Sequence, residues 1–427
     1  MVSLHIAVTP GWESLFWDNT PFLYHSLLRI WVVFFGTGEV MTRALSLLFS
    51  LGTAGLMTWV LAKHLSLRAG IVVGALQALS HLSVFFAREV RPYAIFEMAF
   101  AWSLVELLLF HLGKGSAWRL WSSWVLLGLT NYLSLPLIAI QGGWLGVTYP
   151  AHRRVGFLGG GLALFLLGAA VFGFISWQHL SWQVLKFQVE GQAELYLEIL
   201  RWVFNQSYLW CFAFLATLLV QVVGAIRKTK ALTFGGQMGL LIFVCLVLAP
   251  LFSLIFQRSI FLPRYFVFLS PALSLYWACL VHDYGKEGLR RLRVASSLVF
   301  LGLLLSAWTL LPLYDQIRPP WRKLIETIQT QEGNLVLTSR TPAIQTPYFR
   351  NARIPLRRWS PLSDGSEHLS KLLLEHPNLW LVDSYWASQD YFDSIQIEMK
   401  QAGRFVERFE VTSGFAESLH VLHIRNQ

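Results

Sequence analysis

The chain has 427 residues, of which 55% are hydrophobic and 14% are charged, and its mean hydropathy is +0.50. This composition is too apolar for an ordinary soluble enzyme and is typical of a protein that lies in a membrane. The net charge is +10, and residues 1–314 carry 21 Lys and Arg against 11 Asp and Glu, whereas residues 315–427 carry 13 of each. Because the positive excess lies in the apolar part and not on a soluble face, the charge argues against nucleic-acid binding.

Apolar windows occupy most of the first three quarters of the chain. A transmembrane helix needs about 20 mostly apolar residues. The windows that reach or approach this length are 40–62, 69–87, 92–112, 118–133, 134–149, 155–176, 207–226, 236–256, 264–282 and 295–313. We therefore predict an all-α polytopic membrane protein with about ten transmembrane helices. The weakest windows are 118–133 and 134–149, which only a short turn at residues 134–136 separates.

The loops between these windows differ in charge in an alternating way. One set of loops carries 13 basic residues against only two acids, Asp283 and Glu287. Its bases are Lys63, Arg68, Lys114, Arg119, Arg153, Arg154, Arg227, Lys228, Lys230, Lys286, Arg290, Arg291 and Arg293. The positive-inside rule assigns these loops to the cytoplasm, which predicts a multi-pass protein of the plasma (inner) membrane.

This assignment places residues 1–39 on the extracytoplasmic face. We expect them to form a loop with an interfacial helix, because residues 26–36 are apolar but too short to span a membrane. Residues 40–313 are then the transmembrane domain. Met1–Val8 is too short for a signal peptide and lacks a basic start, so we expect that a first helix is missing from this chain.

The tail, residues 314–427, has an ordinary charge density. Apolar bursts of strand length, such as residues 334–339 and 378–383, alternate with helical stretches at 321–331 and 387–403. The pattern predicts a small α/β domain with its own core. Because it follows the window 295–313, this domain is expected on the extracytoplasmic side.

Three polar clusters are predicted to converge at the extracytoplasmic face. They are residues 18–25, residues 87–94 and residues 257–265. The last two each contain Arg, Tyr and Pro. An Arg beside a Tyr at this depth can simply snorkel to the surface within an aromatic belt. It can also bind a phosphate, because the guanidinium offers a two-pronged hydrogen-bond donor to phosphate oxygens.

The positive-inside rule does not explain arginines on the extracytoplasmic face. Two Arg-Tyr clusters on that face therefore favour the phosphate interpretation. The candidate phosphate-binding residues are Arg91, Tyr93, Arg264 and Tyr265.

Asp18 and Glu89 are the candidate catalytic carboxylates, because either could take a proton from an acceptor hydroxyl. Two alternatives remain open. Glu89 could form an ion pair with Arg88 or Arg91, and Asp18 could cap a helix that begins near Pro21. Glu97 and Glu106 lie within one predicted span and should face protein or water.

No metal-ligand set is evident in the sequence. The three cysteines, Cys211, Cys245 and Cys279, lie in apolar runs without C-x-x-C spacing, so a disulfide framework is not expected. A divalent cation is compatible with the sequence, but no cofactor is required by it.

At these clusters the chain resembles the family-39-like GT-C glycosyltransferases, which are multispanning enzymes related to the protein O-mannosyltransferases and the lipid A aminoarabinose transferase. The first matching frame consists of Asp18, Pro21, Leu23, Tyr24, Phe35, Gly36, Glu39, Arg43 and Ser46. The second is Arg88–Ala94, which reads Arg-Glu-x-Arg-Pro-Tyr-Ala. The third is Pro263-Arg264-Tyr265 with Ser270-Pro271 downstream. The family's Asp-Glu pair at the end of its first spanning helix has no counterpart here.

The resemblance implies a GT-C-type membrane glycosyltransferase that moves a sugar from a polyprenyl-phosphate donor to an acceptor on the extracytoplasmic face. The acceptor would be a glycolipid, polysaccharide or protein of the cell envelope. It also adds Tyr24 and Arg43 to the expected donor-binding residues. Two rivals remain: an inactive or accessory protein that binds lipid-linked sugars, which the missing Asp-Glu pair favours, and a transporter, which the few polar residues within the spans disfavour.

Overall fold

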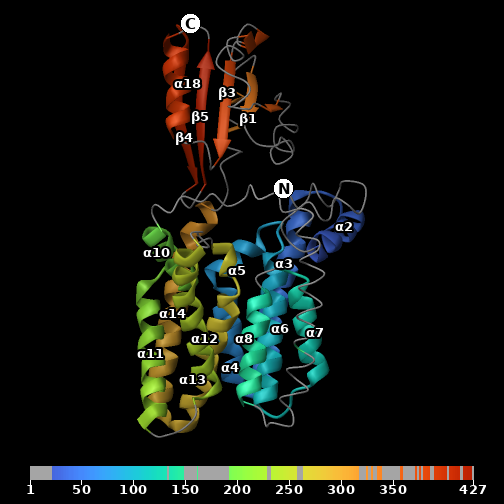
Figure 1. Cartoon of the computed structure of the whole chain (residues 1–427), viewed down its shortest axis with the longest axis vertical. Helices are drawn as coiled ribbons and strands as arrows, with labels where there is room; N and C mark the ends of the chain where they lie inside the picture. The colour runs from blue at the N-terminus through green and yellow to red at the C-terminus, as the bar shows by residue number, and fades with distance from the viewer. Residues whose placement is uncertain are drawn as a thin grey trace. The chain divides into compact units, whose positions relative to one another are not determined.

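The computed structural model describes residues 22–131, 134–148, 161, 192–227, 232–256 and 263–316, together with parts of 324–425. The chain divides into two compact units, one of residues Ile6–Leu310 and one made mainly of Leu311–Gln427. The first unit is helical and the second contains a five-stranded sheet (Figure 1). Asp18 and the rest of the first predicted cluster before Phe22 lie outside the described residues.

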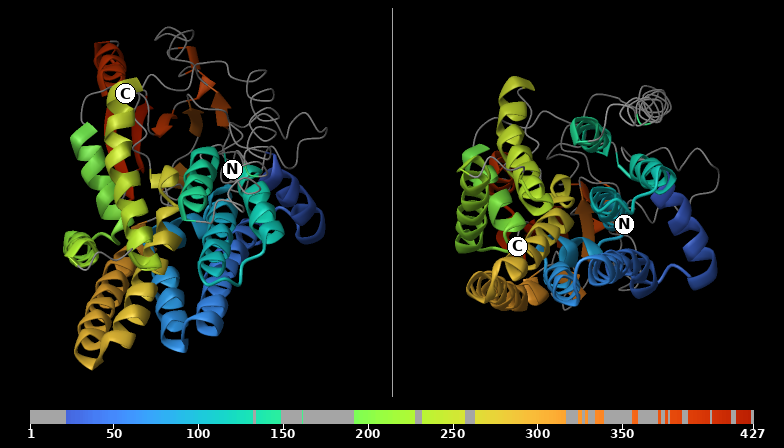
Figure 2. Two further views of the ribbon diagram at one scale, coloured as in Figure 1. Left: turned by 60° about the horizontal axis from the view of Figure 1, so that its bottom comes forward. Right: turned by 90° about the horizontal axis from the view of Figure 1, so that it is seen from below.

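Most of the described helices of the first unit follow the predicted apolar windows. The helices are α2 (Leu23–Phe35), α3 (Glu39–His64), α4 (Leu67–Ala78), α5 (His81–Ala87), α6 (Tyr93–His111), α7 (Ala117–Gly128), α8 (Ser134–Thr148), α10 (Gln192–Val203), α11 (Tyr208–Arg227), α12 (Phe234–Phe256), the 3-10 helix η2 (Pro263–Tyr265), α13 (Leu269–Glu287) and α14 (Leu289–Gln316). Helices α2 and α10 lie outside the predicted windows. Seen from below, α2 lies at one edge of the unit and α11 at the opposite edge (Figure 2).

Four of the described helices are long and apolar enough to cross a membrane. They are α3 from Val40, α6, α11 and α14 up to Leu310. A fifth span results if α4 and α5, which meet at a bend of 58°, are counted together. The structure therefore shows a mostly helical protein with several helices that are candidates for membrane spans. The predicted total of about ten is not confirmed, because α7 and α8 have only 12 and 15 residues and the window 155–176 lies almost wholly outside the described residues.

Helix α6 forms the core of the helical unit. Of its apolar window 89% is buried, compared with 17% for α11 and 22% for α14. A helix that is apolar on all sides and buried is one that other helices surround. Helices α3, α5, α7 and α13 all pack against α6. Its two carboxylates are accordingly inside protein: Glu97 has no exposed surface, and Glu106 is paired with Arg119 of α7 at 3.2 Å.

Helices α3 and α4 approach each other through small residues. A Cβ atom built on Gly70 would lie 2.6 Å from the Cβ of Ala62 and 2.7 Å from the carbonyl oxygen of Thr58. One built on Gly74 would lie 2.2 Å from the Oγ1 of Thr58. Small residues four apart on both helices allow membrane helices to come this close. The α3–α4 contact therefore depends on the absence of a side chain at Gly70.

Replacing Gly70 by alanine is expected to lower the stability of the purified protein by about 1–3 kcal/mol, because the added methyl group meets backbone atoms of α3 that cannot rotate away. The matched control is Gly55→Ala in α3, where an added Cβ meets nothing within 4 Å. Thermal unfolding in one detergent should show a lower midpoint for the first variant only. Equal midpoints for the two variants would contradict this account.

The second unit contains a mixed sheet with the strand order β2-β1-β3-β5-β4. The strands are β1 (Asn334–Thr338), β2 (Leu356–Arg358), β3 (Asn378–Ser384), β4 (Phe405–Ser413) and β5 (Glu417–Arg425). Strand β1 is parallel to β2 and β3, whereas β5 is antiparallel to β3 and β4. Helix α18 (Gln389–Gln401) precedes the β4–β5 hairpin. The unit is thus a small α/β structure.

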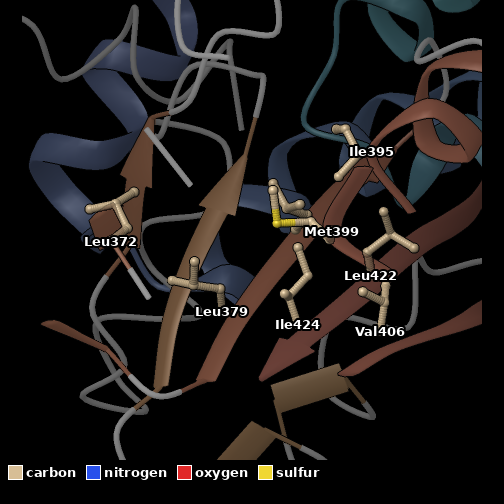
Figure 3. Packing of buried hydrophobic residues seen from close by; sticks show 8 residues of the cluster. Leu372, Leu379, Ile395, Met399, Val406, Leu422 and Ile424 are labelled. Carbon is tan, nitrogen blue, oxygen red and sulfur yellow. The ribbon is translucent and has the colours of Figure 1, made fainter. Parts of the chain in front are cut away.

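One face of this sheet holds a hydrophobic core. Successive strand residues point to opposite faces, so alternate positions of β3 and β5 share one side. Ile395 and Met399, one turn apart on α18, belong to the same buried cluster as these strand residues (Figure 3). The other members of the cluster are Leu372, Leu379, Leu381, Val406, Leu422 and Ile424.

His423 lies between these core positions on β5 and belongs to the other face. It is 1% exposed, its ring stacks on Trp380 at 4.0 Å, and its Nε2 lies 3.2 Å from Oδ1 of Asn378. Burial, helped by the positive charge of Arg425, lowers the pKa of His423 below its ordinary value.

Acidification is expected to destabilise the second unit through His423. An unfolded histidine takes up a proton below pH of about 6.5, whereas the folded one resists protonation. The stabilisation is therefore complete above that pH and is lost as the pH falls. Hydrogen-exchange protection of β5 in the full chain should decrease from pH 7.5 to pH 5.5, and His423→Phe should remove most of the decrease. His376→Gln, in the same unit but outside this stack, is the control and should leave the decrease intact.

Candidate functional site

The segment Arg88–Pro92 connects the end of α5 to the start of α6. The backbone N–H groups of Arg88 and Glu89 donate to the carbonyls of Phe85 and Phe86 at 3.2 and 3.3 Å, which closes the last turn of α5. Pro92 precedes the first residue of α6 with φ of −70°, a position where a proline starts a helix without losing a hydrogen bond. Glu89 and Arg91 are partly exposed, and Tyr93 is buried.

Tyr93 is the residue at which the two predicted Arg-Tyr clusters meet. Its ring packs edge-on against Phe86 at 4.8 Å. The charges of Arg264, Arg91 and Glu89 all act on its hydroxyl group, which also interacts with Tyr265. Tyr93 and Arg264, 171 positions apart in the chain, thus act on one another at one end of α6.

Arg264 and Tyr265 belong to η2, the single turn that precedes α13. This turn packs against α5 and α10. The Arg264 guanidinium carbon lies 5.5 Å from the centre of the Tyr265 ring, within the range of a cation–π contact. Both residues remain partly exposed, so the guanidinium keeps access to a ligand.

Tyr24 is placed differently from the prediction that it binds the donor. It is fully buried in α2, and its hydroxyl bonds to Oγ of Ser46 on α3 at 3.0 Å. Burial raises the pKa of Tyr24, and the charges of Arg91 and Glu89 also reach its hydroxyl. Tyr24 therefore ties α2 to α3 below the site surface. Arg43 is half-buried on α3, one turn before Ser46.

Glu89 is the described carboxylate that acts on these tyrosines. Its charge, like that of Arg91, acts on the hydroxyl groups of both Tyr24 and Tyr93. Glu89 and Arg91 thus act on both Tyr24 and Tyr93, and Arg264 and Tyr265 also act on Tyr93. Asp18, the other candidate carboxylate, is not among the described residues.

A buried polar network centres on Glu97, one turn after Tyr93 on α6. Its Oε1 accepts hydrogen bonds from Nε2 of Gln77, at 2.6 Å, and from the hydroxyl of Ser83. The same hydroxyl lies 2.8 Å from the hydroxyl of Ser270 on α13. All four side chains are buried.

The network continues on both sides of Ser270. Ser270 donates to Oγ of Ser80 at 2.6 Å, and Ser274 donates to Oε1 of Gln77 at 3.3 Å. Gln77 lies in the last turn of α4, and Ser80 directly precedes α5. The other end of α5 leads to Arg91. Ser270 follows Tyr265 by five residues. The network therefore links α5 and α6, which flank the Arg91 segment, to α13, which follows Tyr265.

Sequence reasoning missed this network. It placed Glu97 against protein or water but assigned it no partner. Each member sits in an apolar window, where Ser and Gln are too common to mark a site. The available signal was that a carboxylate and several serine hydroxyl groups occur in predicted spans, and that these spans lie next to the polar clusters.

The arrangement is suited to binding a phosphate next to a proton acceptor. Two guanidinium groups and two phenol hydroxyls can donate to phosphate oxygens, and the start of α6 adds a favourable helix dipole for an anion. Glu89 supplies a carboxylate beside them. Among the described residues, no group of three His, Cys, Asp or Glu side chains could hold a metal ion.

No protein-family model matches the chain, and no curated protein matches it either. Solved structures do. A crystal structure of ArnT from Cupriavidus metallidurans in the apo state superimposes with a TM-score of 0.54 and 14% identity over 98% of this chain and 91% of ArnT. A crystal structure of the same protein bound to undecaprenyl phosphate gives a TM-score of 0.51 and 14% identity over 98% and 92%. ArnT is the lipid A aminoarabinose transferase, a GT-C fold enzyme. The resemblance to the GT-C fold that the sequence motifs indicated is therefore confirmed.

Proposed function

We propose that this chain, built on the fold that ArnT shows, is an integral membrane glycosyltransferase. It transfers a sugar from a polyprenyl-phosphate donor to an acceptor of the cell envelope on the extracytoplasmic face. The observation that carries the proposal is that η2, which holds Arg264, packs against α5, the helix that leads through Arg91 to the start of α6, so that the charges of both arginines reach Tyr93. The bound undecaprenyl phosphate in one ArnT structure supports a lipid-linked donor.

In this proposal Arg91 and Arg264 hold the donor phosphate. A guanidinium keeps its charge when partly desolvated, which suits a phosphate at headgroup depth. Tyr265 lies against the guanidinium group of Arg264, and the charges of both arginines reach the hydroxyl of Tyr93, so the two tyrosines add hydroxyl donors. Arg43 is a further cation for the donor, whereas Tyr24 acts through its bond to Ser46 by holding α2 against α3.

The reaction is a single displacement at the anomeric carbon of the sugar. The acceptor hydroxyl forms the new C–O bond, and its proton passes to a carboxylate, for which Glu89 and Asp18 are the candidates. The bond between the anomeric carbon and the phosphate oxygen breaks, and polyprenyl phosphate leaves. The two arginines stabilise the negative charge that this phosphate gains.

The decisive experiment is a transfer assay with the full chain in liposomes and a panel of polyprenyl-phosphate sugars. The assay measures release of polyprenyl phosphate with and without cell-envelope glycolipid as acceptor. Release that requires both the lipid donor and the acceptor supports the proposal. Donor binding without release would identify a lipid-sugar-binding accessory protein, and the absence of binding to every donor would overturn the donor class as well.

A further inference from the structure

A cavity lies at the end of the helical unit away from the candidate functional site. It has a volume of about 1020 Å³ and lies among the last turns of α11, the start of α12, the last turns of α13 and the first turns of α14. The lower ends of α11, α13 and α14 meet in this region (Figure 1). Because Tyr265 precedes α13 and the cavity borders the other end of that helix, the two sites are about 28 Å apart along it.

The cavity has a charged end and an apolar end. Arg227, Arg290 and Arg291 lie at the charged end. Leu219 and Val220 of α11 line the apolar end and are 63% and 61% exposed, so this part of the cavity opens toward the hydrocarbon of a surrounding membrane. Leu219 precedes Arg227 by eight residues, which is about 12 Å along a helix. This is the spacing of a headgroup and the first part of an acyl chain.

The charges that line the cavity favour an anion. Among the described residues of the lining there are three arginines and two acids, Asp283 and Glu287, which leaves an excess of one positive charge. Glu287 already pairs with Arg291, one turn away on the next helix. Asp283 is held by the hydroxyl of Thr233. Arg227 and Arg290 are therefore the cations that can engage a ligand.

We propose that this cavity binds one anionic glycerophospholipid. Its phosphate lies between Arg227 and Arg290, and an acyl chain follows Leu219, Val220 and Val223. Basic cavities between transmembrane helices on the cytoplasmic side hold anionic lipid headgroups in this way. The bound lipid joins α11 to α14 and stabilises the folded unit, because it binds only the folded state. This site is separate from the donor phosphate site and does not depend on the proposed reaction.

The test uses the delipidated full chain in detergent. Phosphatidylglycerol or phosphatidylcholine is added, bound lipid is counted by native mass spectrometry, and the thermal midpoint is recorded. We expect one phosphatidylglycerol to be retained and to raise the midpoint, with at least tenfold weaker binding of phosphatidylcholine. Equal binding of the two lipids would overturn the proposal. So would an equal rise of the midpoint with inorganic phosphate alone, because a free anion would then account for the site.

Two kinds of variant locate the bound lipid. The double variant Arg227→Gln with Arg290→Gln should weaken phosphatidylglycerol binding at least tenfold, whereas Arg293→Gln, on α14 but outside the cavity lining, should leave it unchanged. Gly224→Leu extends a side chain from the cavity lining without changing charge, and an added Cβ there meets nothing within 4 Å. It should also weaken binding. Unchanged binding in both the double variant and Gly224→Leu would overturn the site.

Discussion

Arg91→Ala is expected to lower the rate of sugar transfer by about 10²- to 10³-fold, with most of the loss in the catalytic rate and a smaller loss in donor affinity. The reason is that a cation beside the departing phosphate gains strength as negative charge develops there. Steady-state kinetics with the best donor of the liposome panel measure the effect. Arg264→Ala should give a loss of the same order, because both charges act on the same hydroxyl of Tyr93.

The controls for this prediction separate charge from folding. Arg68→Ala removes an exposed cation in the first turn of α4 and should leave transfer unchanged. Arg91→Lys keeps the charge but loses the two-pronged geometry, so a partial recovery is expected. If Arg91→Ala transfers sugar at the rate of the unchanged protein, the phosphate role of this cluster is wrong.

Glu97→Leu is expected to destabilise the helical unit by about 2–4 kcal/mol. The substitution removes the acceptor of Gln77 and Ser83 and leaves their donors buried without that partner, and each such loss costs about 1–3 kcal/mol. Glu97→Gln keeps an oxygen acceptor of the same size and should stay close to the unchanged protein. Thermal unfolding in detergent compares the two variants.

The same substitutions test whether the network positions the site. If it holds the two Arg-Tyr segments together, Glu97→Leu should raise the KM for the donor more than it lowers kcat, and Glu97→Gln should restore the KM. Ser270→Ala should cause a smaller change of the same kind. Ser123→Ala is the matched control, because this buried hydroxyl bonds only to a carbonyl of its own helix among the described contacts. Similar effects of the two serine substitutions would contradict the positioning role.

The helical character of the first unit could be predicted because a membrane imposes simple rules. In hydrocarbon every backbone polar group needs an internal partner, so an apolar run of about 20 residues becomes a helix whatever its neighbours are. The windows 40–62, 92–112, 207–226 and 295–313 accordingly correspond to described helices that can span a membrane. The windows 118–133 and 134–149 are short helices, and composition alone does not tell whether such helices cross a membrane.

The candidate site was only partly readable from the sequence. Arg beside Tyr and Pro at the ends of predicted spans indicated which segments carry chemistry, and the order of the motifs indicated the GT-C fold. Tyr24 shows the limit of this reasoning. Its place in the motif suggested contact with the donor, whereas the structure buries its ring against Leu28 and Ile95 and directs its hydroxyl to Ser46.

The sequence by itself determined that this is a helical membrane protein with a small α/β tail and with cationic clusters at the ends of its spans, because hydropathy and charge are local properties. Tertiary structure alone decided that the charge of Arg264 reaches Tyr93, that Glu97 is linked to Gln77 directly and to Ser270 through Ser83, and that Arg227 lines the same cavity as Arg290. Each of these pairings joins residues from different helices. They arise from how helix surfaces pack, which depends on small residues such as Gly70 and on buried hydrogen bonds that no single segment encodes.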